Sequence, residues 1–247
     1  MEQEWITGGT ATVDGVMIDG LGDVRRAPTT RVRTAVDGPV VLAVVGDCLA
    51  TAQEVRDALP AVRAGRWGEL SRWAGSYWVV ADDGRQRFVC GDLAGIRAVY
   101  YARGEEGKQW ATEPGLLGRP LVADLPYLAA RLAAGEHHWP HRSPYEEISM
   151  VPGGFGLLLA SGAPPRLIDI TDVEPVDELR EGAERFGQAL TDAVHLRVRA
   201  ANGVVGQTCP AAWTLRRPSC SPPARGPCTQ SHRPSSASTL DLSIDIR

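Results

Sequence analysis

The sequence predicts an α+β domain of stacked antiparallel sheets with flanking helices. Short β-branched segments separated by turn residues recur up to residue 160, and helical patterns are fewer and lie between or after them. The chain has 247 residues, of which 43% are hydrophobic, so its first 200 residues are enough to bury one core. We therefore expect one domain over residues 1–206.

The predicted strands are the β-rich segments of this region. They lie at residues 10–18, 39–45, 76–81, 86–90, 98–102, 108–112 and 154–160. The segment 39–45 is apolar throughout, which indicates a strand buried on both faces. The four strands between residues 76 and 112 are predicted to form one meander, because Asp82-Asp83-Gly84, residues 91–95 and residues 104–107 supply turn residues between them.

Helices are predicted at residues 51–59, 67–73, 125–134 and 177–200. Thr51 is a suitable N-cap for the first, Glu54 follows three residues later as in a capping box, and Pro60 is expected to end it. The last helix is long and amphipathic. It leads into Gly203-Val204-Val205-Gly206, which has the composition of the beginning of a strand.

Composition and charge exclude several classes of protein. The net charge is −4 and no basic patch points to nucleic acid. No apolar segment approaches the ~18 residues that a membrane span needs, and the acidic start, M-E-Q-E-W, does not resemble a signal peptide. We therefore expect a cytoplasmic protein in which Cys48 and Cys90 are small buried side chains in a reducing compartment.

The composition changes abruptly near residue 207. No Asp or Glu occurs between Asp192 and Asp241, and six of the 18 prolines and three of the five cysteines lie at or after residue 208. Lys108 is the only lysine among the 26 basic residues, which indicates GC-rich coding DNA. Residues 207–247 are therefore predicted to be a disordered tail, which is either genuine or the product of a shifted reading frame.

The codons beneath this break favour the shifted frame. When each new codon is read as the third base of one residue's codon and the first two bases of the next, the step from Trp213 to Thr214 forces Asp. The neighbouring steps permit Ser, Gly, Gly, Leu and Ser. Hence the segment Cys209, Pro210, Ala211, Ala212, Trp213, Thr214 can conceal S-G-G-L-D-S, a loop whose small residues and backbone N–H groups suit the binding of pyrophosphate.

Several upstream segments resemble the glutamine-amidotransferase (class II) domain of the asparagine synthetase family. Residues 91–101 read G-D-L-A-G-I-R-A-V-Y-Y and residues 110–113 read W-A-T-E, against R-D-x-x-G-x-x-P-L-Y-Y and F-A-S-E in the family. Residues 54–56, 73–80 and 148–154 are similar to its E-L-R helix, G-x-F-A-F strand and I-x-x-V-P-P-G turn. The resemblance covers about residues 5–206 and implies an Ntn-hydrolase-like fold.

The catalytic residue of that family is missing. The resemblance calls for an N-terminal cysteine whose own α-amine acts as the base, yet Glu2 stands there and the first cysteine is Cys48. The Asn-Gly-Glu stretch of the family aligns with Gly46-Asp47-Cys48 or with Val45-Gly46-Asp47, and neither register supplies the asparagine. We therefore expect a degenerate domain with no catalytic residue and no hydrolysis of glutamine.

The remaining motif residues are expected to have structural roles. They are Gly46, Asp47, Gly75, Gly91, Asp92, Gly95, Arg97, Tyr100, Tyr101 and Glu113. Asp92 suits a turn, Gly95 is expected to need a positive φ, and Tyr100 and Tyr101 should face opposite sides of a strand, one of them toward the core.

Within that family, the sequence is most similar to the lasso-peptide macrolactam cyclases. These enzymes do not need a glutaminase, because the amine that attacks belongs to the peptide substrate. The resemblance implies that the intact enzyme uses ATP and Mg²⁺ to adenylate an Asp or Glu side chain of a precursor peptide, with a leader peptidase or recognition protein as a further partner. This chain alone should bind no cofactor and be inactive. A glutamine-hydrolysing asparagine synthase homologue and a non-catalytic peptide-binding module remain alternatives.

Two weaker patterns complete the analysis. His137, His138 and His141 lie near Glu136 and could bind a metal, but the neighbouring prolines favour an exposed loop, and we predict no metal site. Cys209, Cys220 and Cys228 do not have the spacing of a zinc site.

Overall fold

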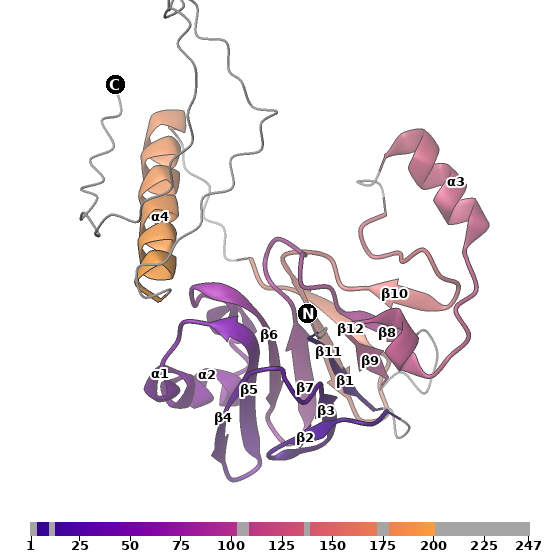
Figure 1. The fold of residues 1–247 in the computed structure, drawn as a ribbon, viewed down its shortest axis with the longest axis horizontal. Coiled ribbons are helices and arrows are strands. Elements are labelled where there is room, and N and C mark those ends of the chain that lie inside the picture. The colour runs from indigo at the N-terminus through magenta and orange to yellow at the C-terminus, as the bar shows by residue number, and fades with distance from the viewer. Residues whose placement is uncertain (1–3, 10–12, 103–108, 136–138, 172–177, 201–247) are drawn as a thin grey trace, which may run out of the picture. The chain divides into compact units, whose positions relative to one another are not determined.

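The structure is a computed structural model that describes residues 4–9, 13–102, 109–135, 139–171 and 178–200 (Figure 1). These residues form two six-stranded sheets in which every paired strand is antiparallel, together with a small number of helices. The predicted α+β class with stacked antiparallel sheets is confirmed.

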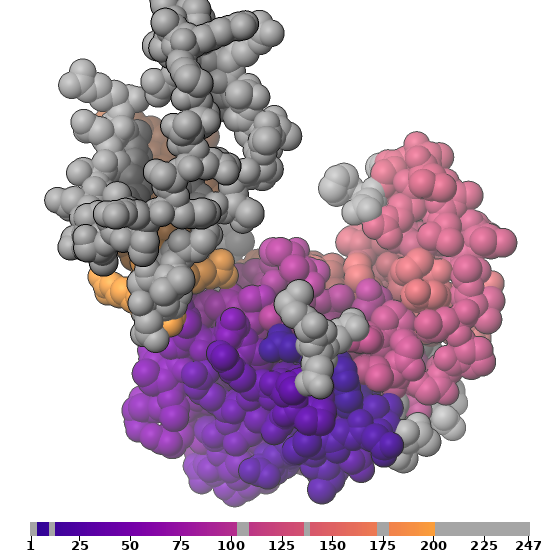
Figure 2. Space-filling view, viewed as in Figure 1, coloured from indigo at the N-terminus to yellow at the C-terminus, as the bar shows by residue number. Residues whose placement is uncertain are grey.

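The first sheet, which we call sheet A, contains early strands and later strands of the chain. Its order is β10 (Ile148–Met150), β8 (Tyr100–Ala102), β9 (Trp110–Ala111), β1 (Ile6–Gly8), β3 (Leu21–Arg26) and β2 (Val16–Ile18). The pairing of β1 with β9 brings the first strand beside a segment about one hundred residues later. In Figure 2, indigo atoms of the N-terminal part of the chain adjoin pink atoms of a later part.

The second sheet, sheet B, has the order β12 (Arg166–Asp169), β11 (Phe155–Ala160), β7 (Gln86–Cys90), β6 (Gly75–Asp82), β5 (Val40–Cys48) and β4 (Val32–Asp37). Strand β5 is buried on both faces, as its apolar sequence predicts. Leu42 and Val44 point into one hydrophobic cluster, while Val41, Ala43 and Val45 point into another. Sheet B is therefore the central layer of the domain.

The two clusters correspond to the two faces of sheet B. The inter-sheet cluster joins side chains of sheet A, including Ile6 and Val24, to Val45, Trp78 and Leu157 of sheet B. The outer cluster lies under α1 (Ala52–Asp57), α2 (Leu59–Arg63) and the 3₁₀ helix η1 (Trp67–Ser71), which lie against the strands of sheet B (Figure 1).

The helix predictions hold closely. Thr51 caps α1 and both bonds of the predicted capping box with Glu54 are present. The predicted stop at Pro60 is wrong: α1 ends earlier, at Asp57, and Pro60 lies in the first turn of α2, where a missing N–H is harmless. The structure adds η2 (Pro114–Leu117), and the predicted later helices are α3 (Leu125–Ala134) and α4 (Leu179–Ala200).

The single predicted meander is wrong. Strands β6 and β7 form a hairpin in sheet B, but β8 and β9 form a second pair in sheet A, so the chain changes sheet between residues 90 and 100. The predicted strand at 10–18 is also too long, because among its described residues only Val16–Ile18 are paired. Strands β1, β3, β4, β10 and β12 were not predicted; β3 and β4 carry charged, solvent-facing residues and β1 and β10 are very short.

Some predictions lie outside the described residues. These are the positions of Glu2, His137, His138, residues 203–206 and the tail from residue 207. Within the described part of the chain, no helix combines the length and the apolar character that crossing a bilayer requires.

Candidate functional site

The motif at residues 91–101 forms the crossover from sheet B to sheet A. The backbone carbonyl of Asp92 accepts a hydrogen bond from the Gly95 N–H at 3.0 Å, and its Oδ1 accepts one from the Arg97 N–H at 3.1 Å. A Cβ on Gly91 would lie 1.8 Å from the Arg97 carbonyl oxygen, so no larger residue fits there. Gly95 has φ 73°, the left-handed conformation expected for this turn.

The crossover places the Arg97 side chain between the two sheets. Its Nη1 donates to Glu4 Oε2 at 2.8 Å, just before β1 of sheet A, and its Nε donates to Ser76 Oγ at 2.9 Å on β6 of sheet B. The guanidinium also stacks 4.4 Å from the centroid of the Trp78 ring. The side chain of Arg97 is 21% exposed, so these contacts are largely shielded from water.

The neighbouring end of β5 and β6 is closely packed. Asp47 lies opposite Ser76, and Cys48 lies opposite Gly75. A Cβ on Gly75 would lie 2.2 Å from the Asp47 carbonyl oxygen, and Gly75 has φ 143°, which explains glycine at this position. Gly46 belongs to the same strand pair, on β5 opposite Tyr77. The Asp47 carboxylate points instead to solvent, where it pairs with the exposed Arg31 at 3.1 Å.

Of the remaining motif residues, Tyr100 and Tyr101 lie on β8 of sheet A, and Glu113 follows β9. Tyr100 packs in a small cluster with Ala111 and Ile148, and Tyr101 packs against the inter-sheet cluster, so the two rings do face opposite sides. Both are half-buried, and burial raises the pKa of Tyr100. Glu113 precedes η2 without capping it; its Oε1 is buried without a hydrogen-bond partner among the described residues, and burial raises its pKa.

Neither cysteine of the described region is suited to nucleophilic attack. Cys48 and Cys90 are buried and unpaired. Burial raises the pKa of Cys48 and raises that of Cys90 to about 12, so both thiols are protonated at neutral pH. No group of three metal-binding side chains occurs in the part of the chain that the structure describes.

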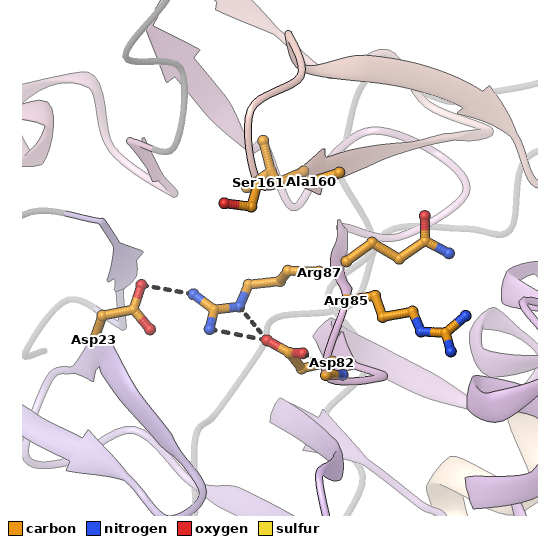
Figure 3. Close-up of a pocket in the computed structure, with 9 residues that line it drawn as sticks. Asp23, Asp82, Arg85, Arg87, Ala160 and Ser161 are labelled. Atoms are coloured by element: carbon orange, nitrogen blue, oxygen red, sulfur yellow. Dashed lines mark hydrogen bonds and ion pairs between the residues drawn. The ribbon is translucent and has the colours of Figure 1, made fainter.

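A separate polar hollow of about 220 Å³ lies at the turn between β6 and β7 and the end of β11, and none of the motif residues lines it (Figure 3). Arg87 crosses it, donating from Nη1 to Asp23 Oδ2 at 2.6 Å and from Nε and Nη2 to Asp82 Oδ2 at 3.1 and 3.0 Å. Because Asp23 lies on β3 and Asp82 on β6, this cluster also joins the two sheets. Asp23 and Arg87 are 64 residues apart, and no sequence pattern indicated their pairing.

Asp82 and Asp83 had been interpreted as turn residues, and both make turn hydrogen bonds. The Gly84 N–H donates to Asp82 Oδ1, and the N–H groups of Arg85 and Gln86 donate to Asp83 Oδ1, each at 2.8 Å. The hollow is therefore formed by a hairpin turn and an ion network.

Comparison with known proteins gives little further information. No protein-family model and no curated protein matches the chain. One solved structure that matches is glutamine phosphoribosylpyrophosphate amidotransferase from B. subtilis, complexed with ADP and GMP, at 11% identity and a TM-score of 0.31. The match covers 59% of this chain and 32% of that one, so it spans about a third of the neighbour's length.

Proposed function

We propose that the sandwich is a degenerate glutaminase-like domain of an ATP-dependent amide-bond-forming enzyme of the asparagine synthetase type. Within that type we favour a lasso-peptide macrolactam cyclase, which joins the N-terminal amine of a precursor peptide to an Asp or Glu side chain. The supporting observation is the convergence of separate motif segments. The crossover at 91–97, the beginning of β6 and the end of β5 meet beside Glu4, at one end of the sandwich.

The residues where these motif segments meet support the proposal that the domain lacks glutaminase chemistry. The resemblance calls for a thiolate and a free amine close to the first strand, whereas here the residues before β1 include Glu4, whose carboxylate binds Arg97. No cysteine precedes Cys48 in the sequence, and the Cys48 thiol is buried. A peptide amine would make the supply of ammonia from glutamine unnecessary.

The residues of this chain do not fit ATP. Between Gly206 and Gly226 the translated sequence has no glycine, and Pro210 lacks the backbone N–H that a phosphate loop needs. The described residues also offer no cluster of side chains for Mg²⁺. We therefore assign ATP and Mg²⁺ to the half that the neighbouring reading frame can encode, and assign no nucleotide chemistry to this chain.

A glutaminase assay tests the first part of the proposal. The purified chain is expected to release no glutamate from glutamine above the level of a buffer control. Release that disappears in a Cys48→Ala variant would show that the domain has an active cysteine and would contradict the proposal.

Resequencing the gene across codons 200–215 tests the second part. A one-base change between about codons 205 and 209 is expected to open a frame of several hundred residues, of the order of one or two further domains. The restored product should bind Mg-ATP and the printed chain should not. Codons for Cys209 to Thr214 that cannot yield S-G-G-L-D-S, or an early stop in that frame, would contradict a lost ATP half and favour a peptide-binding module.

A further inference from the structure

The two sheets end in four edge strands, which are β10 and β2 of sheet A and β12 and β4 of sheet B. Strands β10 and β2 have three residues each and β12 has four. The register of β2 is also interrupted, and β10 is bridged from its neighbouring loop by Arg142 opposite Ser149. Strand β4 has six residues and pairs with β5 in one unbroken register. It is therefore the longest regular edge in the described part of the chain, and such an edge is a template for a further strand.

The backbone groups of β4 alternate between β5 and the outer side of the sheet. The Gly46 N–H donates to the Arg31 carbonyl at 2.9 Å, which makes these two residues a hydrogen-bonded pair of the ladder. This pattern repeats at every second residue, so the odd-numbered residues of 33–37 direct their N–H and C=O groups to β5. The outward-directed residues are Val32, Thr34 and Val36. Among the described residues, no hydrogen bond reaches the main chain of these three.

The side chains of β4 leave this outer edge accessible. Val36 is 53% exposed although it is apolar, and Thr34 is exposed beside it. Arg33 does not block the edge, because its Nη1 donates to the Cys48 carbonyl at 2.8 Å. The strand also contains no proline, lysine or bulge, which are the features that commonly prevent an edge from pairing.

The charges along this edge are complementary to the same strand in reverse. Arg31 precedes β4 and Asp37 ends it, and both side chains are exposed. An antiparallel copy of the strand would place the arginine of each chain opposite the aspartate of the other. An in-register parallel copy would place arginine against arginine. The sequence of the edge therefore favours one partner, a second copy of this chain in antiparallel orientation.

We propose that β4 pairs with β4 of a second copy about a two-fold axis at Thr34. In this register Val32 faces Val36 of the second copy, Thr34 faces Thr34, and Arg31 faces Asp37 at both ends. All outward-directed backbone groups of the strand then find partners, and the exposed Val36 gains an apolar neighbour. Pairs of β-branched residues and of opposite charges stabilise antiparallel strands, and a two-fold interface needs this kind of self-complementarity. The proposal does not rest on the proposed function.

Sedimentation velocity of the full chain tests whether the dimer forms. An interface of one strand pair is small, so we expect a reversible dimer with a Kd of roughly 1–100 μM. The sedimentation coefficient should therefore rise with concentration between about 1 and 500 μM. A chain that remains monomeric at the highest concentration would overturn the proposal.

Substitutions at Thr34 test whether β4 is the interface. Thr34→Pro removes an outward N–H and places a ring on the edge, while the ladder with β5 does not use this N–H. We expect dimerisation at least ~10-fold weaker, with the far-ultraviolet circular dichroism of the monomer unchanged. The matched control, Thr34→Val, keeps the N–H and should dimerise as wild type does. Equal dimerisation of the proline variant and wild type would place the interface elsewhere.

Two charge variants test the register without a change of backbone. Arg31→Asp places aspartates opposite each other, and Asp37→Arg places arginines opposite each other, so each variant alone should dimerise about 10-fold more weakly than wild type. A mixture of the two variants restores opposite charges at both ends and should form a mixed dimer as readily as wild type. Failure of the mixture to associate would contradict the antiparallel register.

Amide hydrogen exchange locates the pairing residue by residue. In dilute protein the amides of Val32, Thr34 and Val36 should exchange fast, while those of Arg33 and Ala35 are protected by β5. At concentrations where the dimer forms, all five should be protected. Slow exchange of the three outward amides in dilute monomer would show that another part of the chain already covers this edge, and the proposal would then be wrong.

Discussion

Arg97 is the residue that joins the motif segments. Its guanidinium donates to Glu4 and Ser76 and stacks on Trp78, so one side chain links sheet B to the segment just before β1 of sheet A. The residue was identified from the sequence only as part of a motif, at a position that the motif leaves open. The neighbouring Gly91 is fixed by the same turn, because a Cβ there would lie 1.8 Å from the Arg97 carbonyl oxygen.

We predict that Arg97→Ala lowers the free energy of unfolding by about 1–3 kcal/mol, because Glu4 and Ser76 lose their partner in a largely shielded place. Arg97→Lys should recover only part of this, since an ammonium cannot donate in a fork while stacking on an indole. Urea unfolding measures the free energy of unfolding of both variants. Arg85→Ala removes an exposed arginine of β6–β7 and should be close to neutral; an equal effect of the two Ala variants would contradict the prediction.

Single elements could be predicted from the sequence where the hydrogen bonds that stabilise them join residues close together in the chain. The Thr51 Oγ1 accepts a hydrogen bond from the Glu54 N–H at 3.2 Å, and the Glu54 carboxylate accepts one from the Thr51 N–H at 2.6 Å. These contacts need only four consecutive residues, so the sequence was enough to predict them. The pKa of Glu54 is lowered, chiefly by the hydrogen bond from the backbone of Thr51.

We predict that Thr51→Ala destabilises the protein by ~1 kcal/mol through loss of the N-cap of α1. Thr51→Ser keeps the hydroxyl and should retain most of the stability. The measurement is the midpoint of urea unfolding at constant m-value. Similar losses in both variants would show that the threonine methyl, and not the cap, is responsible.

At the scale of the whole molecule, the two sheets are held by the inter-sheet cluster and by ion networks at separate places. Arg87 joins Asp23 of sheet A to Asp82 of sheet B. Burial opposes the charged form of Asp23, but the hydrogen bond and charge of Arg87, with further backbone donors, outweigh it, so the pKa of Asp23 is lower than its ordinary value. Its folded pKa is therefore below its unfolded pKa of about 3.9.

Because the folded pKa of Asp23 lies below the unfolded pKa, ionised Asp23 stabilises the folded protein. The contribution of Asp23 to stability is fully present above its unfolded pKa and is lost as the pH falls through its folded pKa. We predict that wild type keeps its advantage over Asp23→Asn from pH 6 down to about 4 and loses it as the pH falls further. The Asp23 side chain is 50% exposed, so the difference should be under ~1 kcal/mol. Unfolding free energies at several pH values measure it, with the exposed Asp19→Asn as control; a difference that grows on acidification would contradict the assignment.

The sequence by itself determined the features that depend on neighbouring residues. It predicted the α+β class, the buried strand β5, the hairpin turn at Asp82-Asp83-Gly84, the capping box of α1 and the extent of α3. Each is encoded within a few consecutive positions as a side-chain period, a cap or a turn residue, and local physics alone selects it.

Only the tertiary structure decided how these elements combine. The sequence does not show that β8 and β9 leave sheet B, because a hairpin has the same local pattern in either sheet. It also does not show that Arg97 reaches Glu4, 93 residues earlier, or that Arg87 reaches Asp23. These contacts connect distant residues whose local patterns carry no information about each other. They form only because closure of the inter-sheet core brings the strands together, and the free energy for that closure comes from burial of the whole apolar interface.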